Sequence, residues 1–395
     1  MRLDHHLISC DDHLDLDQLP ADLWTSRLPA DLRSRAPQVE TRDGRAVWVC
    51  EGEVWGSWSG DAPPPSGPKP AFTAFDRGNV APSERRAAIP ELRLADMDRD
   101  GVFAHVIYGP VFSIVHPEAE VRDACYRAYN DWLADFCSIA PDRLLGVPML
   151  PPNPESAATE LRRLIDNGAF RQANLQIAEV DPPIRDPRWE PLFEMFAESG
   201  WVLSFHVAVF PKKLGIAYDP HKGSPGATFW AAKAFPEQFL DPFVDLFAFG
   251  ILERHPGLKI VMAESGAGWL PWLVEELDYR HWRLWEAAEY WEARGGIPLV
   301  TKPSELFKRQ IYITFQQSPV AMRLLEFFGD NLLWASDYPH PDSIWPKSHA
   351  TIAETMGHLP ADTIRRLTRD NAARLYKLDH LVEPPHSQRA NARGN

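Results

Sequence analysis

Six side chains of the types that bind metal ions close, or directly follow, short and largely apolar runs that are widely separated in the sequence. They are Asp11, His13, His206, Glu264, Asp337 and His340. Asp11 and His13 follow the run at 7–10, and their spacing of two residues places both side chains on one face of a strand. If these runs are parallel strands of one barrel, their carboxyl ends meet where such barrels hold their active sites. The spacing therefore predicts one metal centre.

Each candidate ligand also has a plainer structural interpretation, because a lone histidine or aspartate more often serves the core or caps a helix. Residues 4–6 (Asp-His-His) offer the same spacing as Asp11 and His13, but the apolar run before Asp11 favours the later pair. His206 has apolar neighbours, where an unpaired imidazole is costly to bury and a metal would satisfy it. For His340, in a Tyr-Pro-His-Pro turn, direct ligation and support of another ligand both stay open.

Eight strand-like segments would bring these side chains together. They lie at 7–10, 104–108, 144–150, 173–177, 202–206, 259–264, 311–315 and 332–337. Amphipathic stretches such as 124–139 separate them, and this alternation is typical of βα units around a parallel sheet. We therefore expect a (β/α)8 TIM barrel, a fold that commonly spans about 200 to more than 400 residues.

The domain organisation follows from composition along the chain. We expect a single barrel domain over residues 1–379, followed by a polar tail at 380–395. An insertion at about 16–91, rich in Pro, Gly and Trp, indicates a small β-subdomain after the first strand. The long connection at 207–235 is typical of a lid or substrate loop above the site.

Overall composition excludes several classes of function. The formal net charge of −14 argues against a nucleic-acid surface, which needs clustered Lys and Arg. No apolar run approaches the ~18 residues that span a bilayer. The four cysteines show neither disulfide-type nor metal-type spacing, which indicates a reducing compartment. We expect a cytoplasmic enzyme with a small-molecule substrate.

Several longer segments carry a family resemblance. They are the residues at 8–13, 93–102, 130–133, 255–259, 335–341 and 371–376. With them, nearly the whole chain resembles the amidohydrolase-2 branch of the amidohydrolase superfamily, metal-dependent TIM-barrel enzymes that include decarboxylases. The resemblance implies a metal held by Asp11, His13, His206 and Asp337, and it suggests a homo-oligomer.

Two departures from the branch bear on the reaction. Its decarboxylases and hydrolases carry a catalytic histidine at the end of the sixth strand, where this chain has Glu264. The fourth strand also lacks the bridging lysine of the superfamily's two-metal hydrolases. A second metal would therefore be bridged by Asp11, Glu264, Asp337 or, with less support, Glu179.

The first functional hypothesis comes from counting charge. Three carboxylates in one small site cannot all stay ionised without cations, and two divalent metals would balance them. Mixed His and carboxylate ligation suits Fe as well as Mn or Zn. A subset of the branch with similar motifs resembles non-haem di-iron monooxygenases. This interpretation predicts two Fe and hydroxylation of a bulky lipophilic acid in secondary metabolism, with a CoA-linked substrate near Lys212, Lys213 and Lys222 as one option.

The second hypothesis is a mononuclear Zn- or Mn-dependent hydrolase or decarboxylase of a small organic acid. The metal would polarise a carbonyl or activate water, and Glu264, Asp337 or His340 would transfer protons. These three residues are the catalytic candidates in both hypotheses. A third interpretation, a binding protein without chemistry, fits poorly with so many retained ligand types.

Overall fold

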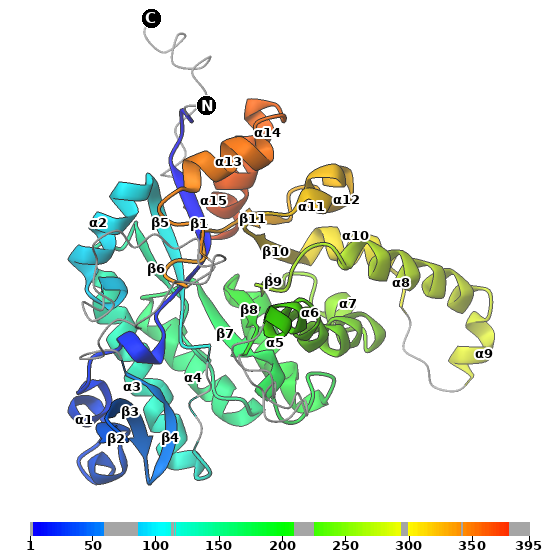
Figure 1. The fold of residues 1–395 in the computed structure, drawn as a ribbon. Helices are drawn as coiled ribbons and strands as arrows, with labels where there is room; N and C mark the ends of the chain where they lie inside the picture. Colours follow the sequence, from blue (N-terminus) through cyan, green and yellow to red (C-terminus); the bar gives the residue numbers. More distant parts are fainter. Residues whose placement is uncertain are drawn as a thin grey trace, which may run out of the picture.

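Eight parallel strands form a ring in the computed structural model, which describes residues 3–58, 86–111, 114, 116–208, 225–293, 299–340 and 343–378 (Figure 1). One sheet has the order β1-β5-β6 and the other the order β11-β10-β9-β8-β7. The strands are β1 Leu7–His13, β5 Val102–Tyr108, β6 Leu144–Gly146, β7 Gln172–Gln176, β8 Val202–His206, β9 Lys259–Ala263, β10 Ile311–Phe315 and β11 Leu332–Trp334.

Backbone hydrogen bonds close the ring at the two places where these sheets meet. Between β6 and β7, the amide of Asn174 donates to the Pro148 carbonyl at 2.8 Å. Between β1 and β11, the amide of His13 donates to the Tyr338 carbonyl at 2.7 Å, and the amide of Asp337 donates to the Asp11 carbonyl at 2.9 Å. The predicted TIM barrel is confirmed, and its last closure lies within the predicted metal centre.

The strands are buried on both faces, as their nearly continuous apolar sequences require. Inside the ring, small and branched side chains such as Ile8, Ala104, Val261 and Leu333 form a packed cluster. Helices cover the outside. They include α2 Pro90–Asp100, α3 Ala119–Ser138, α4 Pro154–Asn167, α5 Glu190–Ser199, α6 Pro225–Ala248, α7 Ile251–Arg254, α8 Leu270–Trp285, α10 Pro303–Gln310, α11 Pro319–Arg323, α12 Leu325–Phe328, α13 Ser348–Met356, α14 Ala361–Arg365 and α15 Asn371–Leu375.

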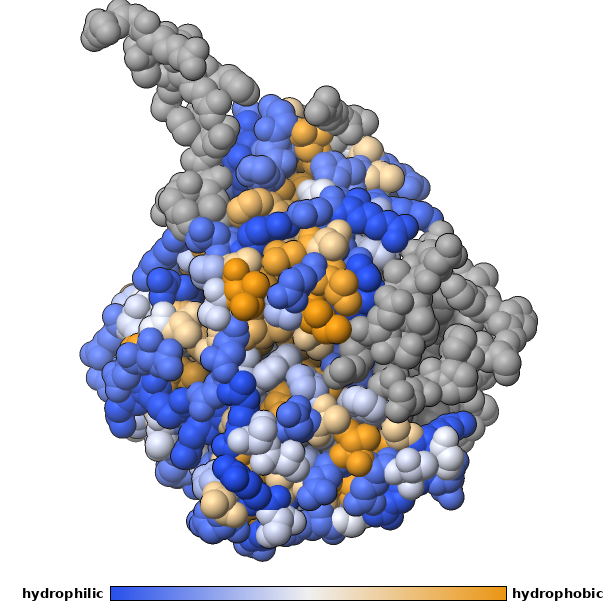
Figure 2. Space-filling view, turned by 90° about the vertical axis from the view of Figure 1, so that its left-hand side faces the viewer, coloured by the Kyte–Doolittle hydropathy of each residue, from blue (hydrophilic) through white to orange (hydrophobic). Residues whose placement is uncertain are grey.

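The insertion after the first strand contains the expected small sheet. Its strands β2 Gln38–Arg42, β3 Arg45–Cys50 and β4 Glu53–Ser57 pair antiparallel. The indole of Trp24, in α1 (Leu23–Arg27), donates to the Cys125 carbonyl of α3 at 3.1 Å and meets the ring of Trp48 edge-on at 4.8 Å. These two indoles attach the small sheet to the barrel. Figure 2 shows that this side of the molecule is largely hydrophilic, with apolar residues gathered in a few areas.

Some boundaries differ from those that the sequence indicated. The third strand ends at Gly146 rather than at 150, because prolines follow it. The long connection expected at 207–235 ends earlier, since α6 already begins at Pro225. Most of that connection, with Lys212, Lys213 and Lys222, lies outside the described residues, as does the tail at 380–395. Among the helices that the structure describes, none is long and apolar enough to cross a membrane.

Candidate metal centre

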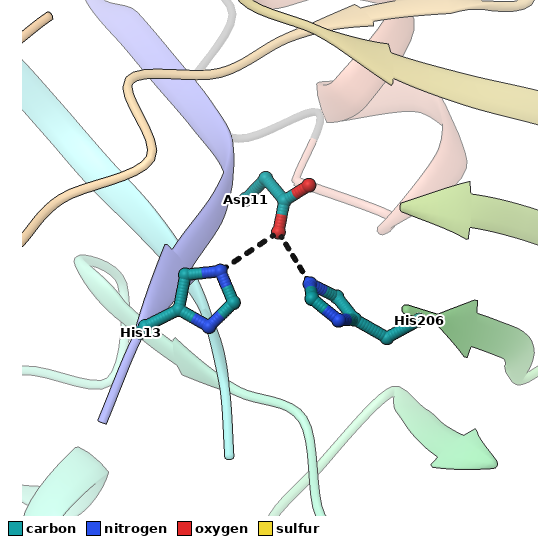
Figure 3. Close-up of side chains that lie close together, drawn as sticks. All are labelled: Asp11, His13 and His206. Carbon is teal, nitrogen blue, oxygen red and sulfur yellow. Dashed lines mark hydrogen bonds and ion pairs between the residues drawn. The ribbon is translucent and has the colours of Figure 1, made fainter. Parts of the chain in front are cut away.

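Three of the predicted ligands converge at the carboxyl ends of β1 and β8. Asp11 Oδ1 lies 3.4 Å from His13 Nε2 and 3.2 Å from His206 Nε2. Figure 3 shows the two imidazoles pointing at one carboxylate oxygen from different strands. One ligand atom from each residue falls within 4.8 Å of the others, and all three side chains are buried. This spacing suits a shared cation.

A second group of ligand atoms adjoins the first and shares His13 with it. His13 Nε2 lies 3.2 Å from Asp337 Oδ1, and His340 Nδ1 lies 2.8 Å from the same oxygen. The rings of His13 and His340 stack at 3.9 Å. The other nitrogen of His340, Nε2, donates to Asp15 Oδ2 at 2.8 Å. Because both ring nitrogens of His340 face carboxylates, this residue can orient Asp337 without itself binding a metal.

The donor atoms of this centre fit a divalent metal ion. His13 Nδ1 and Asp337 Oδ2 are buried without a hydrogen-bond partner in the described part of the chain, whereas His13 Nε2 and Asp337 Oδ1 meet other ionisable groups of the centre. Such orphaned groups each cost about 1–3 kcal/mol, and a bound cation would satisfy them. The Nδ1–H of His206 donates to the Val207 carbonyl at 2.8 Å, which leaves Nε2 free to act as a ligand. Two imidazoles and two carboxylates suit Zn, Mn or Fe.

The electrostatics of the centre are those of tightly paired acids and bases. Burial opposes ionisation of Asp11, but hydrogen bonds from His13 and His206 outweigh it and hold the pKa of Asp11 well below its usual range. Burial and His340 act to lower the pKa of His13, yet the carboxylates of Asp11 and Asp337 raise it to about 10. A proton therefore occupies the His13 imidazole, and metal binding must displace it.

Glu264 lies beside the donor groups and belongs to neither of them. It directly follows β9 with a left-handed backbone, at φ 55°, and its amide donates to Thr314 Oγ1 at 2.8 Å. Its Oε2 is 3.7 Å from His206 Nε2. Burial, and then the negative charge of Asp337, raise the pKa of Glu264 well above its usual range. Both predicted roles of Glu264, as a metal ligand and in proton transfer, stay predictions.

A cavity of about 360 Å³ opens beside the centre. Its polar side carries Asp11, Glu264 and Asp337, while the rings of Phe235 and Phe315 supply apolar wall. Pockets that hold small molecules commonly combine such apolar walls with a few convergent polar groups. The cavity is therefore a candidate substrate site in direct contact with the predicted metal ligands.

Two supporting residues were not found from the sequence. Thr314 Oγ1, on β10, donates to Asp11 Oδ2 at 2.8 Å. Asp15, just beyond β1, holds His340. The signal for Thr314 was an aliphatic hydroxyl near the end of the apolar run 311–315. For Asp15 it was the continuation of the spacing of two residues from Asp11 and His13.

A buried polar network lies behind β1 and fixes its backbone. Arg93, which is fully buried, donates from Nη1 to the His13 carbonyl at 2.8 Å and from Nη2 to His105 Nδ1 at 3.2 Å. Asp12 accepts from Ser336 Oγ at 2.6 Å and from the Tyr338 amide at 3.0 Å. Burial raises the pKa of Asp12 to about 8. The network joins β1 to the loop that carries Asp337.

The other sequence candidates lie elsewhere. In the rival segment at 4–6, His5 contacts Thr368 Oγ1 at 2.8 Å and Asp4 is exposed, so this segment takes no part in the centre. Glu179 ends a short 3-10 turn after β7 (Ile177–Glu179) and belongs to neither donor group.

Comparison with known proteins agrees with the fold and identifies a family. Residues 52–378 match the amidohydrolase family model Amidohydro_2. The gamma-resorcylate decarboxylase of Rhodococcus jostii (strain RHA1) is 26% identical over 307 residues, which are 74% of this chain and 88% of that enzyme.

Several solved structures share the barrel fold. An amidohydrolase from Mycobacterium avium subsp. paratuberculosis K-10 superposes with a TM-score of 0.71 at 20% identity, covering 95% of this chain and 98% of that one. A 5-carboxyvanillate decarboxylase from Novosphingobium aromaticivorans, crystallised with manganese and a nitrobenzoic acid, gives a TM-score of 0.63 at 21% identity, covering 95% and 97%.

These findings overturn the first functional hypothesis. The relatives are decarboxylases, so the expectation of a di-iron monooxygenase acting on a lipophilic or CoA-linked acid is wrong, and the pair of iron ions that depended on it has no support. The charge count failed for a physical reason. Glu264, with its raised pKa, can stay neutral, and one divalent ion then balances the carboxylates of Asp11 and Asp337, so a second metal is not required.

The family match begins in the small sheet and ends at the last described residue, and it covers most of the chain. The chain therefore belongs to the amidohydrolase-2 family of the amidohydrolase superfamily and is one of its metal-dependent enzymes.

Proposed function

We propose that the chain is a mononuclear, divalent-metal-dependent decarboxylase of a small aromatic acid. The observation that carries the proposal is the convergence of Asp11, His13, His206 and Asp337 beside a cavity of about 360 Å³, whose wall includes Asp11 and Asp337. The 26% identity to a gamma-resorcylate decarboxylase and the manganese in a structural neighbour support this reaction and this kind of metal.

The four donor residues would hold the metal ion, with Thr314 and His340 orienting the carboxylates of Asp11 and Asp337. Once bound, the ion supplies a Lewis acid that attracts the substrate carboxylate and stabilises negative charge.

The remaining walls suit the ring of the substrate. Phe235 and Phe315 offer apolar surface for an aromatic ring, and the volume is at the small end of the roughly 300–1,000 Å³ typical of ligand pockets. We therefore place the carboxylate of the substrate toward the donor residues and its ring against the phenylalanines.

Among the described residues that line the cavity, Glu264 is the ionisable one that belongs to neither donor group. In the reaction the bond between the ring carbon and the carboxylate breaks, carbon dioxide leaves, and the electron pair stays on the ring carbon. That carbon must then take a proton. Glu264 stands where the resemblance places the catalytic histidine of the branch, and we assign it this proton transfer.

The test is an assay of the purified chain with manganese or zinc and a panel containing 2,6-dihydroxybenzoate and 5-carboxyvanillate. We expect metal-dependent release of one carbon dioxide per substrate, with deuterium from D2O at the carbon that lost its carboxylate. A variant with Asp337→Asn is the matched control and should release none. If the metal-loaded enzyme hydrolyses esters or lactones but decarboxylates no aromatic acid, the proposal is contradicted.

A further inference from the structure

Two glutamines follow the end of β10 and line the cavity beside the metal centre. They are Gln316 and Gln317, and the cavity has a volume of about 360 Å³. Gln316 is half-buried, whereas Gln317 is exposed. A carboxamide does not act as an acid or a base near neutral pH, so the role of these side chains in a reaction must be in binding.

Gln316 continues the row of side chains that contains Thr314. Residues two apart along a strand point to the same face, and Gln316 lies one residue beyond the end of β10. Thr314 Oγ1 donates to Asp11 Oδ2 at 2.8 Å, so this row begins at the donor atoms and leads into the cavity. Two residues along a strand span about 6.6 Å. That span is comparable with the length of a benzoic acid from its carboxylate to a substituent at the opposite position of the ring.

The carboxamide of Gln316 has no hydrogen-bond partner among the residues that the structure describes. The neighbouring hydroxyl of Ser318 is already engaged, because it caps α11 by accepting the amide of Ala321 at 3.3 Å. Water can serve the carboxamide while the cavity is open, but a ring that fills the cavity displaces that water. The bound molecule must then supply a partner, since a desolvated amide left unpaired is costly.

A phenolic hydroxyl suits both the carboxamide and the charge of the cavity wall. The carboxamide offers N–H donors and a carbonyl acceptor, and a hydroxyl can use either. Asp11, Glu264 and Asp337 already place three carboxyl groups on this wall. A second carboxylate on the substrate would add charge of the same sign, which is unfavourable. A neutral hydroxyl adds no charge.

We propose that Gln316 selects benzoic acids that carry a hydroxyl group at the ring position opposite the carboxylate. This inference rests on the proposed function, because it places the carboxylate of the substrate at the donor residues. Phe235 and Phe315 offer apolar surface to any aromatic ring. Recognition of the hydroxyl therefore falls to Gln316, and the substrate class is narrower than aromatic acids in general.

Isothermal titration calorimetry of the metal-loaded chain with two nitro compounds tests the inference. A nitro group has the shape of a carboxylate but cannot leave as carbon dioxide, so binding is measured without turnover. The first compound, 4-nitroresorcinol, carries a hydroxyl opposite the nitro group, and the second, 2-nitrophenol, lacks only that hydroxyl. We expect the wild type to bind 4-nitroresorcinol about 10-fold more tightly, the effect of one well-formed hydrogen bond.

Three variants show whether Gln316 is the source of this preference. Gln316→Met keeps the length of the side chain without the carboxamide, and it should bind the two compounds about equally. Gln316→Glu retains acceptors for the hydroxyl and should keep a preference for 4-nitroresorcinol. Gln317→Met is the matched control, because Gln317 is the same side chain one position outside the row of Thr314. It should keep the wild-type preference.

Equal binding of the two compounds by the wild type would overturn the inference, and so would a preference that Gln316→Met leaves unchanged. Failure of the proposed function gives a different result. In that case the preference depends on Gln316, but the metal-loaded wild type releases no carbon dioxide from 2,4-dihydroxybenzoate. If neither nitro compound binds, both the inference and the placement of the substrate are overturned.

Discussion

Thr314 Oγ1 donates a 2.8 Å hydrogen bond to Asp11 Oδ2 and so fixes the carboxylate whose other oxygen faces two imidazoles. The same hydroxyl accepts the amide of Glu264 at 2.8 Å. One side chain on β10 therefore orients a predicted metal ligand from β1 and the backbone of the predicted proton carrier after β9. Residues that orient ligands in this way commonly matter about as much as the ligands.

Replacing Thr314 by valine should weaken the binding of divalent metal about 10–100-fold, because the shape is kept while the hydrogen bond to Asp11 is lost. Competition with a fluorescent chelator measures the affinity for manganese or zinc. Thr314→Ser is the control and should bind nearly as tightly as the wild type. Equal affinity in the valine variant would show that Asp11 needs no such support.

Removal of the metal should destabilise the fold, because the orphaned atoms of His13 and Asp337 would again be buried without partners. At a metal concentration 100 times the Kd, bound metal contributes about 2.7 kcal/mol to the free energy of unfolding. Thermal unfolding with a chelator, and again after manganese is restored, measures the difference. In the Asp337→Asn variant, the rise in melting temperature on adding metal should be smaller than in the wild type. A melting temperature that does not respond to metal in the wild type would argue against this centre.

Glu264→Gln should separate metal binding from catalysis. Since Glu264 belongs to neither donor group, the variant should retain about one metal per chain, as elemental analysis would show. Its turnover should fall about 10²–10⁴-fold, the usual contribution of a positioned acid or base. Loss of the metal in this variant would instead identify Glu264 as a ligand.

His105 should make stability depend on pH. Burial, and then the positive charge of Arg93, lower the pKa of His105 well below 6.5 in the folded state. In the unfolded chain the pKa returns to about 6.5, so below that pH the unfolded state binds a proton that the folded state does not. The free energy of unfolding should therefore fall as the pH drops from 7.5 to 5.5.

Urea unfolding of the wild type and of His105→Asn, both with a chelator present, measures this effect. The variant keeps an acceptor near Arg93. Its free energy of unfolding should fall less steeply with decreasing pH, by up to about 1.4 kcal/mol per pH unit. Identical slopes would mean that folding does not lower the pKa of His105.

Trp24 tests whether the insertion and the barrel form one domain. Its indole is fully buried between Trp48 and α3, so Trp24→Ala should cost about 3–5 kcal/mol of stability. If the insertion and the barrel unfold together, the loss appears in a single transition. Val54→Ala, at an exposed position of β4, should change stability by less than about 0.5 kcal/mol. Two transitions in the Trp24 variant would separate the small sheet from the barrel.

The sequence was a good guide to the barrel because its strands are buried on both faces, which leaves short apolar runs between amphipathic segments. Asp11 and His13 could be paired for the same reason, since spacing of two on a strand determines a shared face. Such local patterns do not predict contacts between side chains on different strands of the barrel. Nothing local indicates that Thr314 reaches Asp11, 303 positions away.

The site was harder to predict where protons and backbone geometry matter. Counting carboxylates suggested two metals, but the count treats every acid as ionised, whereas burial keeps the pKa of Glu264 high. His340 was predicted as a ligand or a supporting residue, and its contact with Asp15 could be seen only once the loop after β11 was placed. Which of these two roles His340 takes stays a prediction.

Glu264 and Asp337 both follow their strands with left-handed backbones, at φ 55° and 62°. Side chains other than glycine take up this conformation at a cost of roughly 1–2 kcal/mol. Glycine at either position would relax the chain and at the same time delete a carboxylate beside the metal centre. Selection for stability alone would therefore favour replacement of these two carboxylates by glycine. Carboxylates kept at both positions in a homologous sequence would indicate that the chemistry is still under selection.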